Sequence, residues 1–183
     1  MKIGIDISPV LYGTGVSQYT ENLVKSLLKL NTDDDYILLG GSLRGRERLV
    51  KFTSTLSGNF VGKLFYYPPT LADIVWNRMH MFKVEKLIGS IDVFHSSDWT
   101  QPPTDAFKVT TIHDLIPLKF PKYIHPQIVS VHKRRLEWVK KEVDRVIVPS
   151  EATKEDLLLL GIAKEKIRVI PEAPVYSPSG WKE

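Results

Sequence analysis

Short, mostly apolar segments alternate with longer segments of helical periodicity along the chain, and this alternation constrains the fold more than any other feature. The chain begins with an apolar segment at residues 2–7, a loop at 8–15 and a helix expected over 16–30. Runs with few polar positions, such as 146–148, are typical of strands buried on both faces. Further strands are expected at 36–40, 59–67, 91–95, 107–112, 145–148 and 166–170, with helices at 71–88, after Pro126 and after Ser150. The pattern predicts an α/β fold, a doubly wound, mostly parallel sheet flanked by helices.

The size and composition are those of a globular domain. The 183 residues are enough for one domain with a substantial core, and 43% of them are apolar. No run approaches the ~18 apolar residues that suggest a membrane span. Asp6 interrupts the first apolar segment, which argues against a signal peptide. The chain has no cysteine, which excludes disulfides and cysteine catalysis and agrees with a cytoplasmic location.

The last twelve residues differ from the rest. Residues 172–183 include Pro174, Pro178 and Gly180 and show no periodicity that would let them pack. We therefore expect one domain over residues 1–171, followed by a linker over 172–183.

A glycine-containing loop precedes the first helix. Gly13, Thr14 and Gly15 come just before Val16, where the helix is expected to begin. Glycine lets a ligand approach the backbone, and the free N–H groups of a first helical turn attract anions such as phosphate. The dinucleotide motif Gly-x-Gly-x-x-Gly is not met, because its third glycine would fall at Gln18. The loop is either such an anion cradle or simply a turn.

Polar residues follow several expected strands directly. In a doubly wound sheet the carboxyl ends of the strands form one edge, where ligands bind. The segments expected at this edge are Gly13–Gly15, Ser96–Trp99, His113 with Asp114, and Pro149 with Ser150. Four polar loops at one edge, beside a linker, suggest a cleft whose second wall is another domain. Ser150 is expected to cap the following helix, and His95 is expected to be structural.

A basic cluster accounts for the net charge of +4. Between residues 122 and 145 there are seven Lys or Arg residues and three Asp or Glu residues. The cluster is either a solvated helix face or a contact with an anionic membrane, and nucleic acid is disfavoured because no recognition motif accompanies it. Its members on one expected helix are Lys133, Arg134, Arg135, Lys140 and Lys141.

Two other kinds of site are disfavoured. No spacing of His, Asp and Glu indicates a metal site, so we expect no metal and no cofactor. A Ser-His-Asp hydrolase would need a Gly-x-Ser-x-Gly elbow, which the chain lacks.

The ordered set of motifs resembles the amino-terminal domain of the retaining, GT-B-fold glycosyltransferases of family four. The segments that carry the resemblance are residues 3–7 with 13–16, 92–95, 109–115, 144–150 and 166–171. The version with His113-Asp114-Leu115-Ile116-Pro117 is most similar to mannosyl- or related hexosyltransferases. After Pro171 the family usually has Asn-Gly, whereas this chain has Glu172-Ala173.

The resemblance implies two Rossmann-like domains facing each other across a cleft. The carboxyl-terminal domain would grip the nucleotide sugar with a basic residue and a Glu-x7-Glu type motif. The amino-terminal domain would hold the acceptor and close its glycine loop on the donor diphosphate. The expected function is therefore the acceptor-binding half of an enzyme that transfers a hexose from a nucleotide-sugar to a glycan or lipid-linked acceptor. On its own this half would have little or no activity.

Specific roles follow from the resemblance. We expect Gly13, Thr14, Gly15 and Val16 to form the donor-phosphate loop. His113 and Asp114 are candidate catalytic residues, because an imidazole at a strand end can meet a sugar hydroxyl or stabilise a departing group. Tyr12, Asp98 and Trp99 are candidate acceptor-binding residues, since carboxylates and aromatic faces suit sugars. For four of these residues the alternative is a purely structural role: His113, Asp114, Asp98 and Trp99.

Two alternatives to a transferase remain. One is half of a different GT-B protein, such as a nucleotide-sugar 2-epimerase. The other is a non-catalytic module that binds a ligand in the open crevice, or an anionic membrane at the inner face through its basic helix.

Overall fold

The computed structural model describes residues 1–30 and 33–173. Residues 174–183, which make up most of the expected linker, lie outside the described residues. The elements in chain order are β1 (Lys2–Asp6), η1 (Ser8–Leu11), α1 (Gly15–Leu30), β2 (Asp35–Gly41), α2 (Arg46–Ser54), β3 (Phe60–Phe65), α3 (Pro69–Ala72), η2 (Asp73–Arg78), α4 (Glu85–Ile88), β4 (Val93–Ser96), β5 (Phe107–Thr111), α5 (Ile116–Lys119), η3 (Pro121–Tyr123), α6 (Pro126–Glu142), β6 (Arg145–Val148), α7 (Glu151–Leu159), η4 (Lys164–Lys166) and β7 (Ile167–Val169).

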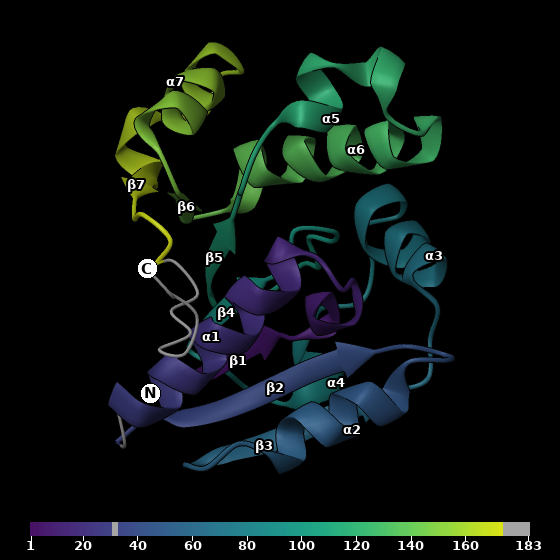
Figure 1. The fold of residues 1–183 in the computed structure, drawn as a ribbon, viewed down its shortest axis with the longest axis vertical. Coiled ribbons are helices and arrows are strands. Elements are labelled where there is room, and N and C mark those ends of the chain that lie inside the picture. The colour runs from purple at the N-terminus through teal and green to yellow at the C-terminus, as the bar shows by residue number, and fades with distance from the viewer. Residues whose placement is uncertain (31–32, 174–183) are drawn as a thin grey trace, which may run out of the picture.

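The strands form one parallel sheet of seven, in the order β3-β2-β1-β4-β5-β6-β7 (Figure 1). The order reverses between β1 and β4, so the chain winds outward in both directions from this point. The expected doubly wound α/β fold is confirmed. In such a sheet the loops after the two central strands diverge and leave a crevice at the carboxyl edge.

β2 shows why the sheet is covered on both faces. Tyr36 and Leu38 pack in a core cluster with residues of α1 and α2, such as Val24 and Phe52. Leu39, the next residue along, packs instead with residues of η2 and α4, such as Trp76. Side chains of a strand alternate between its two faces, so apolar residues at successive positions require helices on both sides.

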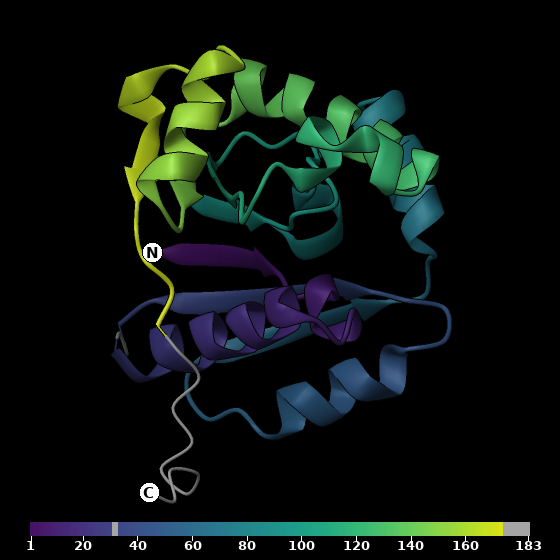
Figure 2. The same ribbon diagram turned by 45° about the horizontal axis from the view of Figure 1, so that its top comes forward.

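A third core cluster lies between α6, α7 and strands β6 and β7, with Leu136, Val139, Val146 and Leu157 among its buried members. Figure 2 shows α6 and α7 gathered over one end of the sheet and α1 and α2 over the other. The side chain of Ser150 accepts a hydrogen bond from the amide of Thr153 and caps α7, as the sequence predicts.

The single helix expected over 71–88 is wrong. The chain forms α3 and the π-helical η2, leaves helical geometry after Arg78, and forms a second helix only at α4. His80 and Phe82 adopt positive φ angles of 49° and 69°, which cost about 1–3 kcal/mol each for residues with a Cβ. Tertiary contacts offset this cost. The indole of Trp76 donates to the carbonyl of Phe82, and the His80 ring stacks on Trp138 with 3.5 Å between ring centres.

The basic helix is only partly a surface feature. Arg135 is 4% exposed and donates to Thr110 Oγ1 and the Thr111 carbonyl. The expectation that Arg135 faces a membrane with the other cations is therefore wrong. Arg135 is four residues from both Val131 and Val139, which are buried, so it lies on the inner face of α6. Lys133 and Lys141 are exposed.

No helix in the described part of the chain combines the length and the apolar character needed to cross a bilayer.

Candidate functional site

The glycine loop is held by one side chain of the helix that follows it. Ser17 Oγ accepts from the amides of Gly13 and Thr14 at 2.8 and 3.3 Å, and donates to the Pro9 carbonyl at 2.8 Å. Gly13 has a φ of +70°, a conformation that a residue with a Cβ rarely adopts. The loop is therefore fixed in shape, and Gly13 is needed for its backbone.

Gly15 serves a different purpose. A Cβ on Gly15 would meet nothing within 4 Å, so the fold of the described residues does not require glycine there. The amides of Gly15 and Val16 have no hydrogen-bond partner among these residues. They form the positive end of the 16-residue helix α1, which suits an anionic group. The arrangement leaves both amides open to a phosphate.

A pocket of about 160 Å³ lies where β5 ends beside the start of α1. Four predicted site residues line it together: Val16, Asp98, His113 and Asp114. Two residues of α6, His132 and Arg135, complete its polar lining. Two of the four loops expected at the sheet edge, Ser96–Trp99 and His113 with Asp114, thus meet at this pocket beside the start of α1, whereas Pro149 and Ser150 are not among its lining residues. Helix α6 supplies a wall that the sequence analysis did not include.

Asp98 and Arg135 dominate the electrostatics of this pocket. Asp98 Oδ1 is buried with no hydrogen-bond partner among the described residues. Burial raises the pKa of Asp98, while the positive charge of Arg135 and the nearby His113 oppose the rise. Burial also lowers the pKa of Arg135 to about 10, so its guanidinium is still charged at neutral pH. The pocket therefore contains a fixed cation beside a carboxylate with a free acceptor oxygen.

His113 is held on two sides. Its Nδ1 atom lies 2.6 Å from Glu172 Oε1, and the Tyr19 ring meets its ring edge-on at 4.7 Å between centres. The side chain is 16% exposed. Asp114 is exposed, and its carboxylate accepts from the amide of Ile116 at 2.8 Å. Asp114 thus stabilises the turn that leads into α5, which is the structural role expected as an alternative. It also lines the pocket.

Two other histidines near the site are neutral at physiological pH. His95 Nε2 contacts Thr111 Oγ1 at 3.0 Å, and Tyr19 Oη shares the same hydroxyl. His132 meets Trp99 edge-on, with 6.0 Å between ring centres. Burial lowers the pKa of each histidine to about 4. Each of these rings is therefore uncharged at neutral pH and carries a single N–H proton. His113 is the candidate for proton transfer because it lines the pocket and its Nδ1 contacts a carboxylate.

Tyr12 and Trp99 line a second pocket of about 160 Å³, next to the ends of β1 and β2. Trp99 Nε1 and the Tyr67 hydroxyl are buried with no partner among the described residues. Burial raises the pKa of Tyr12 well above its usual value, and the carboxylates of Asp98 and Asp6 add to the effect. Because buried polar atoms are normally hydrogen-bonded, the free groups mark this pocket as a place for a polar ligand.

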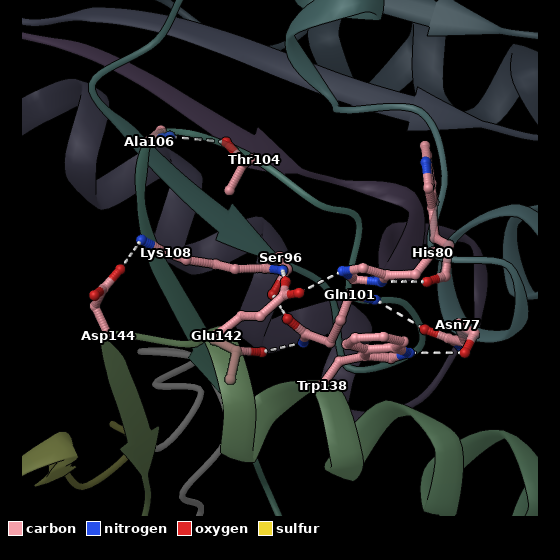
Figure 3. A network of polar contacts seen from close by, with 12 residues as sticks. Asn77, His80, Ser96, Gln101, Thr104, Ala106, Lys108, Trp138, Glu142 and Asp144 are labelled. Carbon is pink, nitrogen blue, oxygen red and sulfur yellow. Dashed lines mark hydrogen bonds and ion pairs between the residues drawn. The ribbon is translucent and has the colours of Figure 1, made fainter.

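A buried polar network fixes the loop that carries Asp98 and Trp99. The Asn77 side chain donates to the Trp99 carbonyl at 3.0 Å. It also accepts from the Gln101 amide at 3.0 Å (Figure 3). Gln101 in turn accepts from Ser96 and donates to Thr110, both at 2.9 Å. A satisfied buried network of this kind rigidifies the residues it joins, so the loop after β4 is preorganised.

Sequence reasoning missed four residues of the site: Tyr67, His132, Arg135 and Glu172. For Arg135 a signal existed, since it repeats at helical spacing with the apolar Val131 and Val139. The positions of Tyr67 and His132 depend on how distant segments pack, which no local pattern shows. Among residues 1–30 and 33–173, no three His, Asp or Glu side chains are grouped closely enough to hold a metal ion.

Comparison with known proteins gives one finding. The family model described as Glycosyltransferase Family 4 matches residues 13–173, which is more than half of the chain. The matched segment includes the glycine loop from Gly13 onward, all the residues that line the pocket of His113, and Glu172. A search of the curated proteins gives no match.

Proposed function

The chain belongs to glycosyltransferase family 4, and on this premise we propose that it is the acceptor-binding half of a retaining, GT-B-fold hexosyltransferase. The donor would be a nucleotide-sugar, and the acceptor a glycan or lipid-linked sugar. The observation that carries the proposal is the pocket that places Val16, Asp98, His113 and Asp114 together beside the positive end of α1.

The donor diphosphate would bind at the start of α1. The free amides of Gly15 and Val16 would donate to a phosphate oxygen, and the helix dipole would stabilise its charge. The open space next to Gly15 leaves room for the leaving group. This accounts for glycine at a position where the surrounding structure would accept a larger residue.

His113 would act on the reacting sugar. Because its Nδ1 faces Glu172, Nε2 is the ring atom left to meet a sugar hydroxyl or the charge that develops as the diphosphate departs. Asp98 would accept a hydrogen bond from a sugar hydroxyl through its free Oδ1. Asp114 would do the same from its exposed side, and Tyr12 and Trp99 would line the acceptor pocket.

The remaining assignments are also proposals. We expect a cytoplasmic protein that needs no metal or other cofactor and does not bind nucleic acid. Contact with an anionic inner membrane face would use Lys133, Lys140 and Lys141. Arg134 would contribute less, because its guanidinium pairs with Asp73 at 2.7 Å. A second, donor-binding domain is required as a partner for transfer.

A transfer assay tests the proposal. The 183-residue chain, and the same chain joined to its donor-binding domain, would be incubated with nucleotide-hexose donors and candidate acceptors. Transfer is expected only when both domains are present, with the anomeric configuration of the donor retained in the product by NMR. Robust transfer by the 183-residue chain alone would contradict the claim that a separate donor-binding domain is needed. An inverted product would contradict the retaining mechanism.

A further inference from the structure

An apolar pocket of about 240 Å³ lies beside the irregular segment between β3 and β4. None of its lining side chains is charged. Only Tyr67 and Trp76 have a polar side-chain atom, and the Trp76 indole already donates to the carbonyl of Phe82. The lining residues are Tyr67, Leu71, Ala72, Val75, Trp76, Phe82 and Leu87. Such a pocket offers a hydrocarbon chain a surface to cover, and offers a free sugar little to bind.

This apolar pocket adjoins the polar pocket of Tyr12 and Trp99. Tyr67, Ala72 and Trp76 line both of them. Tyr67 and Trp76 pack edge-on, with 5.8 Å between ring centres. The free hydroxyl of Tyr67 and the free Nε1 of Trp99 are both buried, and both residues line the polar pocket. The two pockets together suit a molecule with a polar head and an apolar tail.

The backbone is strained at Phe82, which forms one wall of the apolar pocket. Phe82 has a φ of +69° and its side chain is 56% exposed, although it lines the apolar pocket. The segment is fixed by His80, whose Nε2 lies 2.6 Å from Glu142 Oε1 (Figure 3). Glu142 is itself held by the buried Lys108 at 3.0 Å. Strained backbone that is held by many contacts is typical of functional segments.

Apolar and cationic side chains flank Phe82. Met79 and Met81 are 57% and 52% exposed in the segment that carries Phe82. Lys86 is exposed, and its Nζ lies 5.0 Å from the centre of the Phe82 ring, whereas Arg78 pairs with Asp73 at 3.2 Å. A cation next to an apolar opening complements a lipid that carries an anionic group near its tail.

We propose that this apolar pocket binds the hydrocarbon part of an amphiphilic acceptor whose head occupies the polar pocket. The inference rests on the proposed function and narrows it, because it selects a lipid-linked acceptor over a free glycan. The polar head would bind next to Tyr12 and Trp99, and the tail would lie over Tyr67 and Trp76 toward Phe82.

Methionine labelling tests this in the 183-residue chain itself. The chain has three methionines, so methionine labelled with carbon-13 at its methyl group gives three signals, with Met79 and Met81 within three residues of Phe82 and Met1 as an internal control. The labelled chain is titrated with methyl, hexyl and octyl β-glucosides below their micelle concentrations. We expect saturable shifts at Met79 or Met81 but not at Met1. Affinity should rise about fourfold for each methylene that becomes buried.

Two pairs of variants locate the tail and the head. Phe82→Asn removes the aromatic wall but keeps a residue that tolerates positive φ, and should weaken octyl glucoside about tenfold. Phe120→Asn changes an equally exposed phenyl group elsewhere and should leave the affinity unchanged. Leu71→Gln removes a second apolar side chain from the pocket lining, at an exposed position, and should also weaken octyl glucoside. Tyr67→Phe should weaken the binding of octyl glucoside but not of octanol, because only the glucoside has a sugar head that can occupy the polar pocket.

Three results would overturn the inference: equal binding of methyl and octyl glucosides, parallel shifts of Met1, or unchanged affinity in both Phe82→Asn and Leu71→Gln. Because these readouts need no catalysis, they separate the two proposals. Binding of alkyl chains together with failure of sugar transfer by the complete protein would refute the proposed function alone. Transfer to water-soluble glycans without any tail dependence would refute the apolar pocket alone.

Discussion

Glu172 Oε1 lies 2.6 Å from His113 Nδ1 and joins the segment after β7 to the candidate catalytic imidazole. A carboxylate at Nδ1 fixes both the ring orientation and the tautomer of a histidine. Because Glu172 follows β7, the contact also ties His113 to the segment after the last strand of the sheet. We interpret Glu172 as a positioning residue for His113.

In the 183-residue chain, Glu172→Ala should increase the Nε2–H tautomer of neutral His113 at the expense of Nδ1–H. Nitrogen-15 chemical shifts of the two ring nitrogens measure this directly. Glu172→Gln should restore most of the Nδ1–H form, since the amide oxygen still accepts a hydrogen bond. The interpretation fails if the tautomer is the same in the wild type and in Glu172→Ala.

The glycine loop makes opposite predictions for its two glycines. Gly15→Val should leave the free energy of unfolding within about 0.5 kcal/mol of the wild type, because open space surrounds the position. In the complete enzyme the same change should weaken use of the nucleotide-sugar. Gly13→Val should destabilise the fold by at least about 1 kcal/mol, since φ is +70° there. Urea unfolding and steady-state kinetics measure the two effects, and unchanged donor kinetics in Gly15→Val would exclude the phosphate role.

Stability should fall in mild acid because of the buried histidines. Burial lowers the pKa of His95 and His132 to about 4, against ~6.5 in an unfolded chain. Below about pH 6.5 the unfolded state therefore binds more protons than the folded state, so the free energy of unfolding decreases as the pH falls toward 4. Each histidine should account for about 2.5 kcal/mol between pH 7.5 and 4.5.

The variant His132→Gln should lose about 2 kcal/mol less over this range than the wild type, as measured by urea unfolding at several pH values. His125→Asn is the matched control, because His125 is exposed and asparagine can replace it as a helix cap. The reduction in acid sensitivity should be larger in His132→Gln than in this control. The raised pKa of Asp98 has the opposite effect on stability. Because this carboxyl binds a proton more readily in the folded state than in the unfolded state, its protonation near pH 4 increases the free energy of unfolding. Equal acid sensitivity of His132→Gln and the wild type would contradict the assignment.

Arg135 and Lys133, two residues apart in one basic run, should respond very differently to the same change. Arg135→Met should cost about 3 kcal/mol of unfolding free energy, because it leaves buried acceptors and the Asp98 carboxylate without their cation. Lys133→Met should cost less than about 0.5 kcal/mol at its exposed position. Denaturant unfolding of both variants compares them, and similar losses would mean that the burial of Arg135 does not matter.

The fold could be predicted because its signals are local. The runs of the inner strands and the helical spacing of Leu136 and Val139 depend only on residues close in sequence. The helix expected over 71–88 failed because distant residues determine its interruption. The Trp138 ring that stacks on His80 comes from α6, far along the chain, and no local propensity contains that contact.

The candidate site was predictable to the extent that topology determines it. Asp98, His113 and Val16 follow strands or begin the first helix, so the parallel sheet brings them to one edge. The Gln101–Asn77 network that holds Asp98 in place and the partner of His113, Glu172, depend on side-chain packing across elements. A count of Lys and Arg residues cannot tell the buried Arg135 from the exposed Lys133.

The most direct test of the central claim is the turnover of the complete protein with His113→Ala. The account predicts that kcat for sugar transfer falls about 100-fold or more, while the thermal midpoint is preserved. His125→Asn, at a residue that does not line the pocket, should retain wild-type kcat. A His113→Ala enzyme that keeps kcat within about threefold of the wild type would contradict the account, because transfer would then not depend on this crevice.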